Sequence, residues 1–250
     1  MKYVLRTEGL TRSFGAFKAN SNISLAFEAG ARHAIIGPNG AGKTTLINLL
    51  TGALAPSAGE VFLDEEEITD LAQHIRVKRG MTRTFQINTL FPRLTVMESV
   101  MLACCERAGG GGVWWLPVSR ARPQIDEARD ILARLRLDRD ASVESRELPY
   151  GKQRLLEIAL ALATKPRVLL LDEPAAGIPA AESAELFGVI AALPRDVSII
   201  FVEHDMDLVF RFAEKITVLV GGTVLVEGSP EEIARDRRVR EVYLGEAIDG

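Results

Sequence analysis

The sequence predicts an α/β fold with a mainly parallel sheet, an antiparallel β part and an inserted α-helical part. Three observations support this prediction. Short apolar runs separated by turns fill the first part of the chain, as is typical of strands. Helical patterns dominate residues 86–164, and beyond them apolar runs alternate again with a helix. Strands that alternate with helices favour a parallel sheet covered on both faces.

The first part of the chain contains four expected strands and one helix. The strands are residues 3–5, 23–27, 33–36 and 61–63. The apolar run at residues 34–36 indicates a buried strand. The helix covers residues 43–50 and ends at Gly52, a common position for glycine after a helix.

The middle of the chain is expected to be helical. Thr95 and Glu98 form a capping box at the start of one helix, and Pro123 suits the first turn of another. The expected helices are residues 96–108, the segment that begins at Pro123, and residues 151–164. A glycine-rich loop with Trp114 and Trp115 separates the first two helices. These tryptophans either cover the helical core or form a docking patch for a partner.

Strand patterns return in the last part of the chain. The expected elements are strands at 168–171 and 198–202, a helix at 180–193, and strands at 217–220 and 223–226. The last two strands flank a two-glycine turn, which indicates a hairpin. We therefore assign residues 1–85 and 165–250 to an α/β core with a β subdomain. Residues 86–164 form a helical subdomain, and the whole is a single domain.

The composition is that of an ordinary soluble globular protein. The chain has 250 residues, of which 47% are hydrophobic and 26% charged, and its formal net charge is −4. No basic face is indicated, so we expect no nucleic-acid partner. Because no apolar run approaches ~20 residues and the start lacks the order of a signal peptide, we expect a cytoplasmic chain. Adjacent Cys104 and Cys105 are expected to be small apolar side chains in a reducing compartment.

Residues 37–44 read GPNGAGKT, the spacing of a phosphate-binding loop ahead of a helix. Glycines let successive backbone N–H groups point at phosphate oxygens without a Cβ in the way. Lys43 supplies a positive charge for the β- and γ-phosphates, and the hydroxyl of Thr44 suits Mg²⁺. The sequence therefore predicts binding of a nucleoside triphosphate. The expected binding residues of this loop are Gly37, Pro38, Asn39, Gly40, Ala41, Gly42, Lys43, Thr44 and Thr45.

Polar side chains follow two of the expected buried strands. Asp172 and Glu173 come directly after one strand, and His204 lies just past the next. The carboxyl ends of strands in an α/β sheet border the crevice in which ligands bind. Asp172 suits a water-mediated Mg²⁺ position, and Glu173 suits a base or orienter for the attacking water. His204 is expected to contact the γ-phosphate or that water.

Taken in order over nearly the whole chain, these motifs resemble an ATP-binding-cassette (ABC) nucleotide-binding domain, a P-loop NTPase with a RecA-like core. The resemblance implies that ATP is the nucleotide. It also implies that Phe14 stacks on adenine, although a half-buried turn residue is the alternative. Gln86 would reach the Mg²⁺ and water region, so that Mg²⁺ is held by Thr44, Gln86 and Asp172. The expected catalytic residues are Glu173, His204, Gln86 and Lys43.

Residues 148–153 (LPYGKQ) resemble the family signature, which opens a helix onto the γ-phosphate held by the opposite subunit of a head-to-tail dimer. Pro149 replaces the usual serine, so the phosphate contact falls to backbone N–H groups, especially that of Gly151. Lys152 replaces the usual glutamine and either places a charge near the phosphate or points into solvent. Pro179 replaces the aspartate of the loop that meets its counterpart across the dimer. The expected nucleotide contacts of the signature are Pro149, Tyr150, Gly151 and Lys152.

A finer resemblance is to the ATPase subunits of high-affinity branched-chain amino-acid importers. It is carried by Tyr150, residues 172–177 and residues 242–246. It implies a chain that binds transmembrane permease subunits and lies peripherally on the inner face of the cell membrane. A second ATPase subunit, identical or different, would complete the dimer, and a solute-binding protein would be an indirect partner.

The cargo and the docking surface stay open at this point. Leu90 and Phe91 either form part of a docking groove for the permease or belong to the core, and no residue contacts the solute. One alternative is an export ATPase of lipopolysaccharide type, which shares this short architecture. Another is a soluble cassette that acts on the ribosome or DNA, although no paired cassette, long coiled coil or basic arm is visible.

Overall fold

A computed structural model describes residues 2–84, 91–109 and 122–246, with the side chains of 244–246 left out. The chain forms two compact units. The core unit consists of Met1–Met81, Arg167–Pro174 and Pro194–Gly250, and the helical unit of Thr82–Pro166 and Ala175–Leu193. The sequence-based assignment places Ala175–Leu193 in the core. In the structure this segment belongs to the helical unit, because its helix contacts the signature helix.

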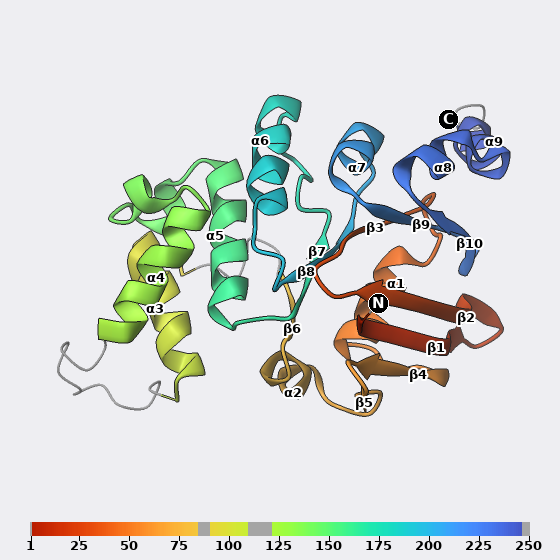
Figure 1. Cartoon of the computed structure of the whole chain (residues 1–250), viewed down its shortest axis with the longest axis horizontal. Helices are drawn as coiled ribbons and strands as arrows, with labels where there is room; N and C mark the ends of the chain where they lie inside the picture. Colours follow the sequence, from red (N-terminus) through yellow and green to blue (C-terminus); the bar gives the residue numbers. More distant parts are fainter. Residues whose placement is uncertain (1, 85–90, 110–121, 247–250) are drawn as a thin grey trace. The chain divides into compact units, whose positions relative to one another are not determined.

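An antiparallel sheet forms one layer of the core unit. Its strands are β1 (Tyr3–Phe14), β2 (Phe17–Glu28), β4 (Ala58–Leu63) and β5 (Glu66–Glu67), in the order β2-β1-β4-β5. Figure 1 shows β1 between β2 and β4. Three expected strands lie within these elements, but β1 and β2 are much longer than their apolar runs. Pairing along both edges of β1 continues the strand through polar residues such as Thr11 and Arg12.

The second sheet is mainly parallel, as predicted. Its strands are β3 (Arg32–Ile36), β6 (Met81–Arg83), β7 (Val168–Asp172), β8 (Ser198–Val202), β9 (Lys215–Val220) and β10 (Thr223–Gly228). Their order is β10-β9-β3-β8-β7-β6. β3 pairs in parallel with β8 and β9, β7 pairs in parallel with β8, and the expected hairpin joins β9 to β10. Every residue of β3 and β8 is buried, as central strands of a covered sheet require.

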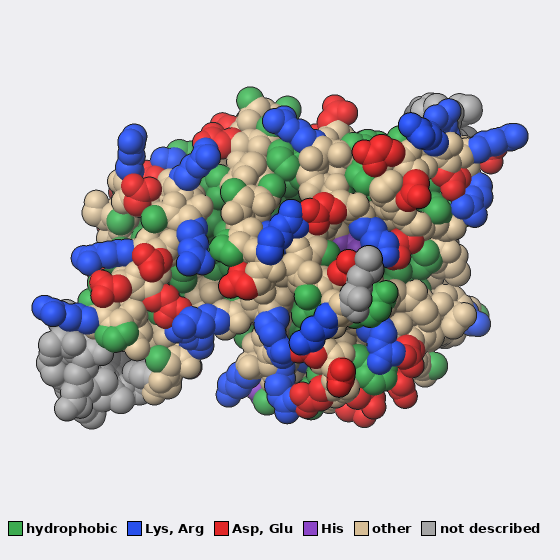
Figure 2. Space-filling model, in the orientation of Figure 1, with side chains coloured by type: hydrophobic (Ala, Val, Ile, Leu, Met, Phe, Trp, Pro, Cys, Tyr) green, Lys and Arg blue, Asp and Glu red, His purple; other side chains and the backbone are tan. Residues whose placement is uncertain are grey.

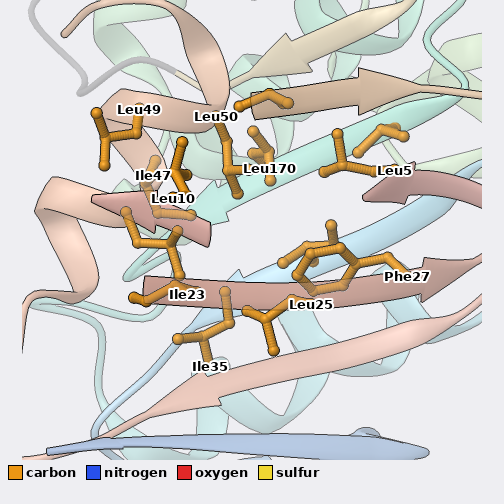
Figure 3. Close-up of a cluster of buried hydrophobic side chains, with 14 of the residues drawn as sticks. Leu5, Leu10, Ile23, Leu25, Phe27, Ile35, Ile47, Leu49, Leu50 and Leu170 are labelled. Carbon is orange, nitrogen blue, oxygen red and sulfur yellow. The ribbon is translucent and has the colours of Figure 1, made fainter. Parts of the chain in front are cut away.

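Hydrophobic side chains from both sheets and from helix α1 (Lys43–Thr51) form one core within this unit. Figure 3 shows Leu10 and Ile23 from the antiparallel sheet, Ile35 from β3 and Leu50 from α1 around a common interior. Burying side chains of this size contributes about 1.5–3 kcal/mol each. The core therefore fixes α1, and with it the segment that precedes it.

The guanidinium of Arg76 forms hydrogen bonds with backbone carbonyls at the C-terminal end of α1. Arg76 belongs to helix α2 (Gln73–Lys78), and only 1% of its surface is exposed. Its guanidinium donates to the carbonyl oxygens of Leu49 (2.9 Å), Leu50 (2.5 Å), Thr69 (2.6 Å) and Leu71 (2.9 Å). Burial lowers its pKa to about 10. The side chain thus satisfies carbonyls that a helix end leaves without intrahelical partners.

The helical unit contains the expected helices. They are α3 (Val96–Arg107), α4 (Arg122–Arg134), α5 (Tyr150–Ala163) and α6 (Ala180–Ala191), with short 3₁₀ turns η3 (Asp138–Asp140) and η4 (Ser145–Glu147). The predicted capping box of Thr95 and Glu98 is present. α3 packs against α4 and α5, as Figure 1 shows. Cys104 is fully buried, and burial raises the pKa of its thiol to about 11.

Three further helices complete the core unit: α7 (Met206–Phe212), α8 (Pro230–Arg235) and α9 (Arg237–Glu246). Asp205 caps α7, and Ser229 with Glu232 forms a capping box on α8. Among the described residues, no helix has both the length and the hydropathy needed to cross a bilayer. On the face shown in Figure 2, lysine and arginine side chains are interspersed with aspartate and glutamate.

Candidate nucleotide-binding site

The phosphate loop connects β3 to α1 in the core unit. A pocket of about 280 Å³ lies over it. It is lined by Phe17, Ala19, Asn39, Gly40, Ala41, Gly42, Lys43, Thr44, Thr45, Glu173 and His204. Gly37 and Gly42 both have positive φ, and a Cβ would collide with the carbonyl of Leu219 at Gly37 and with that of Ala19 at Gly42. The loop therefore needs glycine for contacts within its own chain as well as for phosphate.

Lys43 is the first residue of α1 and is 6% exposed. Its Nζ donates to the carbonyl oxygens of Gly37 at 2.6 Å and Pro38 at 2.9 Å. The ammonium is therefore held over the loop, within the lining of the pocket. This places a positive charge beside the start of α1, where backbone N–H groups and the helix dipole also favour an anion.

The strand register brings the polar strand-end residues to this edge. In the parallel pairs, Val202 of β8 lies opposite Ile35 of β3 on one side and opposite Asp172 of β7 on the other. The phosphate loop, Asp172–Glu173 and His204 consequently leave the sheet at the same edge. Hydroxyl and carboxylate oxygens such as those of Thr44 and Asp172 are the ligands that Mg²⁺ prefers, so these residues fit the ion.

Glu173 and His204 are in direct contact. Oε1 of Glu173 lies 2.7 Å from Nε2 of His204, and the two side chains are 40% and 46% exposed. The sequence predicts both residues at the site but does not predict this hydrogen bond. Glu173 also has φ +50°, which is unfavourable for a residue with a Cβ. Its N–H donates to the carbonyl of Val202 at 3.0 Å, which helps to hold this backbone.

Two phenylalanines flank the turn between β1 and β2. Phe14 and Phe17 form a cross-strand pair and are 49% and 65% exposed. The guanidinium of Arg12 lies 4.7 Å from the ring centre of Phe14. Phe17 lines the pocket, whereas Phe14 is not among its lining residues. Sequence reasoning missed Phe17, although a second aromatic residue just beyond the turn at Gly15 was the available signal.

The signature residues lie at the start of α5 in the helical unit. Pro149 is the N-cap residue and makes no side-chain cap. The hydroxyl of Tyr150 accepts a hydrogen bond from Nη2 of Arg154 at 3.0 Å. Nζ of Lys152 donates to both carboxylate oxygens of Asp140, at 2.8 and 2.9 Å. Lys152 is expected from the sequence either to place its charge near the phosphate or to point into solvent, and neither alternative includes Asp140 as its partner.

Some expected site residues lie outside the described part of the chain. These residues are Gln86, Leu90, Trp114 and Trp115. Their predicted roles stay predictions. Phe91, which follows Leu90, is described and is 56% exposed.

The fold and the pocket define a nucleotide-binding protein of the P-loop class. A family model described as ABC transporter matches residues 20–176. A second, described as branched-chain amino acid ATP-binding cassette transporter, matches residues 223–249. The chain belongs to the ABC transporter family, and its activity is ATP hydrolysis.

Individual relatives agree with this assignment. The chain is 38% identical over 251 residues to the high-affinity branched-chain amino acid transport ATP-binding protein BraF of Pseudomonas aeruginosa, covering 98% of each protein. It resembles the ADP conformation of an ATP-binding cassette of an ABC transporter with a TM-score of 0.86 and 30% identity, covering 98% of this chain and 100% of the other. A dimeric cassette bound to ADP and Pi matches with a TM-score of 0.71 and 25% identity, covering 90% and 98%.

These findings confirm the predicted family, fold class and ATPase activity. They also confirm the resemblance to ATPase subunits of branched-chain amino-acid transporters, because both the tail model and the full-length relative belong to that branch. The lipopolysaccharide-type and non-transport alternatives are not favoured.

Proposed function

We propose that the chain is the ATP-hydrolysing subunit of an importer for branched-chain amino acids or similar small solutes. It works as a head-to-tail dimer, peripherally at the inner face of the membrane. The observation that carries this proposal is the grouping of the phosphate loop, Glu173 and His204 around one pocket of the core unit. The signature segment belongs to the other unit, whose described residues form no phosphate loop. A second subunit would supply one.

The chemistry follows from the residues around the pocket. Lys43 and the N–H groups of the loop bind the β- and γ-phosphates, and Phe14 or Phe17 stacks on the adenine. Thr44 and Asp172 would hold Mg²⁺, and the bound ion would neutralise phosphate charge. Glu173 orients the attacking water and accepts its proton as the water oxygen bonds to the γ-phosphorus; the bond from that phosphorus to the oxygen bridging the β- and γ-phosphates breaks, so that ADP and phosphate leave. His204 holds the carboxylate of Glu173 through their 2.7 Å hydrogen bond.

The partners belong to the same proposal. The full-length relative is named as a branched-chain amino acid transport protein, which supports amino acids of that class as the cargo. Exposed apolar side chains of the helical unit, Phe91 and Leu102, support a docking surface for a permease there. The solute contacts the permease and its binding protein, so their identity sets the cargo.

The decisive experiment is Glu173→Gln. We expect hydrolysis to fall by about 10²-fold or more, because the water loses its base. ATP with Mg²⁺ should then produce a long-lived dimer that ADP does not, as measured by sedimentation. Glu65→Gln, an exposed carboxylate in the same unit, is the matched control and should behave like the parent. A Glu173→Gln protein that stays monomeric and hydrolyses ATP at the parental rate would contradict the proposal.

The trapped protein also tests the partners. Subunits that co-purify with it from membranes should include permease chains and a solute-binding protein of amino-acid type. Lipid-export subunits in their place would favour the export alternative, and nucleic acid would favour the non-transport one.

A further inference from the structure

Lys152 occupies an electrostatically unfavourable position. It is the third residue of α5, after the N-cap Pro149, and the first turn of this helix contains no acidic residue. The start of a helix carries partial positive charge, so a lysine there is repelled and a carboxylate is favoured. The signature helix therefore needs an anion from elsewhere in the chain to offset this lysine.

Asp140 supplies that anion from the turn η3. Its backbone is fixed on both sides, because its N–H donates to Leu137 at 3.0 Å and its carbonyl accepts from Val143 at 2.9 Å. Its carboxylate is 17% exposed and takes both hydrogen bonds from Lys152, whose side chain is 43% exposed. A carboxylate on a rigid turn loses little conformational freedom in such a pair, which makes the pair more effective than one between two mobile chains.

Other charges surround the same helix start. A pocket of about 270 Å³ beside it is lined by Lys152 together with Arg136, Glu182 and Glu185. Oε2 of Glu182 lies against Gly151, where it would be 3.1 Å from an added Cβ. Asp140, however, is the group that accepts hydrogen bonds from Lys152. Loss of its carboxylate would leave the ammonium mobile and without that neutralising partner.

We propose that Asp140 is a positioning residue that holds and neutralises Lys152, so that the signature helix of this chain meets ATP with no net side-chain charge at its first turn. The inference rests on the proposed function, because the head-to-tail dimer is what brings a triphosphate to this helix. Without the Asp140 carboxylate, the lysine is attracted to the phosphates of the opposite subunit, and ATP closes the dimer at a lower concentration.

The test measures the ATP concentration at half-maximal dimerisation by sedimentation, in the Glu173→Gln background, which prevents turnover. Asp140→Asn removes the charge at nearly constant shape. Asp138→Asn, an exposed carboxylate in the same turn, is the matched control for long-range charge effects. Lys152→Gln and the double variant complete a thermodynamic cycle. Each variant is measured at low and high salt after thermal melting has verified its fold.

We expect Asp140→Asn to lower the half-dimerisation concentration about two- to fivefold, the range of a partly exposed ion pair. High salt should shrink this shift, and Asp140→Glu should restore the parental value. In the presence of Lys152→Gln, the Asp140→Asn shift should fall to that of Asp138→Asn. A merely structural role for Asp140 would not produce this dependence on Lys152.

Several outcomes overturn the inference. One is an Asp140→Asn midpoint equal to the control, and another is an equal shift with and without Lys152. If Asp140→Asn fails to fold, Lys152→Gln decides alone: a rise in the required ATP beyond fivefold means that Lys152 itself binds phosphate, which contradicts the proposal. If neither Asp140→Asn nor Lys152→Gln changes the ATP concentration at half-maximal dimerisation, only this inference is overturned. No ATP-dependent dimer of the Glu173→Gln protein overturns the proposed function as well.

Discussion

His33 is a buried titratable side chain at the start of the central strand β3. It is 1% exposed, its Nε2 lies 2.7 Å from the hydroxyl of Thr217, and its ring packs edge-on against Phe27 with ring centres 4.7 Å apart. Burial, and secondarily the charge of Lys215, lower its pKa to about 3 from an ordinary 6.5. The folded protein thus keeps this imidazole neutral where an unfolded chain would protonate it.

The resulting prediction concerns acid stability. Between pH 6.5 and about 3 the unfolded state binds a proton that the folded state does not, so stability falls as pH decreases through this window. From pH 7 to pH 5, the loss attributable to His33 should be on the order of 1–2 kcal/mol. Urea unfolding of His33→Gln should show a correspondingly smaller pH dependence. His74→Gln, at an exposed position, is the control, and equal pH dependence in both variants would contradict this account.

At the scale of residues, local motifs were predictable and tertiary partners were not. Gly37 and Lys43 stand in one short segment whose spacing carries their role. The pairing of Lys152 with Asp140, by contrast, joins two segments through a turn that has no sequence signal of its own. The contribution of Phe17 to the pocket likewise depends on how the turn at Gly15 directs the two strands.

Among the elements, α1 shows how a helix end depends on a distant side chain. Arg76 donates to the last carbonyls of α1 and to the segment that precedes α2. Arg76→Met keeps an apolar stem but leaves four carbonyls without this partner, so we expect a loss of about 3 kcal/mol or more in unfolding free energy. Lys78→Met, exposed on the same helix, should change stability by less than about 0.5 kcal/mol.

Chemical denaturation of the two variants checks this prediction. Similar midpoints for Arg76→Met and Lys78→Met would mean that water replaces the guanidinium without cost. Because α1 begins at the phosphate loop, we also expect Arg76→Met to bind nucleotide more weakly, whereas Lys78→Met should bind normally.

Element types were easier to predict than element lengths. Buried strands such as β7 and β8 coincide with their apolar runs, since both faces of these strands are covered. The apolar run that predicts the first strand ends at residue 5, but β1 continues to Phe14 because its polar residues pair with β2 and β4. The short helix α2 was not predicted, since its single buried residue is an arginine.

For the whole molecule, nucleotide binding should raise the free energy of unfolding. A ligand that binds only the folded state stabilises it by about 2.7 kcal/mol at 100 times its dissociation constant. With a non-hydrolysable ATP analogue and Mg²⁺ at that level, we expect the melting temperature to rise by roughly 5–11 °C, because 1 kcal/mol corresponds to about 2–4 °C for a chain of this size. Removal of Mg²⁺ by a chelator should reduce the shift, because in the proposed site Thr44 and Asp172 would hold an ion that neutralises phosphate charge.

Lys43→Ala should abolish the same thermal shift, as measured by calorimetry, because the phosphates lose the charge that the loop holds over them. Lys2→Ala, an exposed lysine at the start of the chain, should retain it. A full shift in Lys43→Ala would place the nucleotide elsewhere.

The parallel pairing of β3 with β8 also has a consequence for biosynthesis. The N–H of Gly30, just before β3, donates to the hydroxyl of Ser198 at 2.8 Å across 168 residues of sequence. Contacts this distant in sequence form only after the intervening chain exists. A nascent chain that has just completed its phosphate loop therefore lacks both Glu173 and His204. In the proposed mechanism, competence to hydrolyse ATP therefore arises only when translation has passed the helical segments and β8 can enter the sheet.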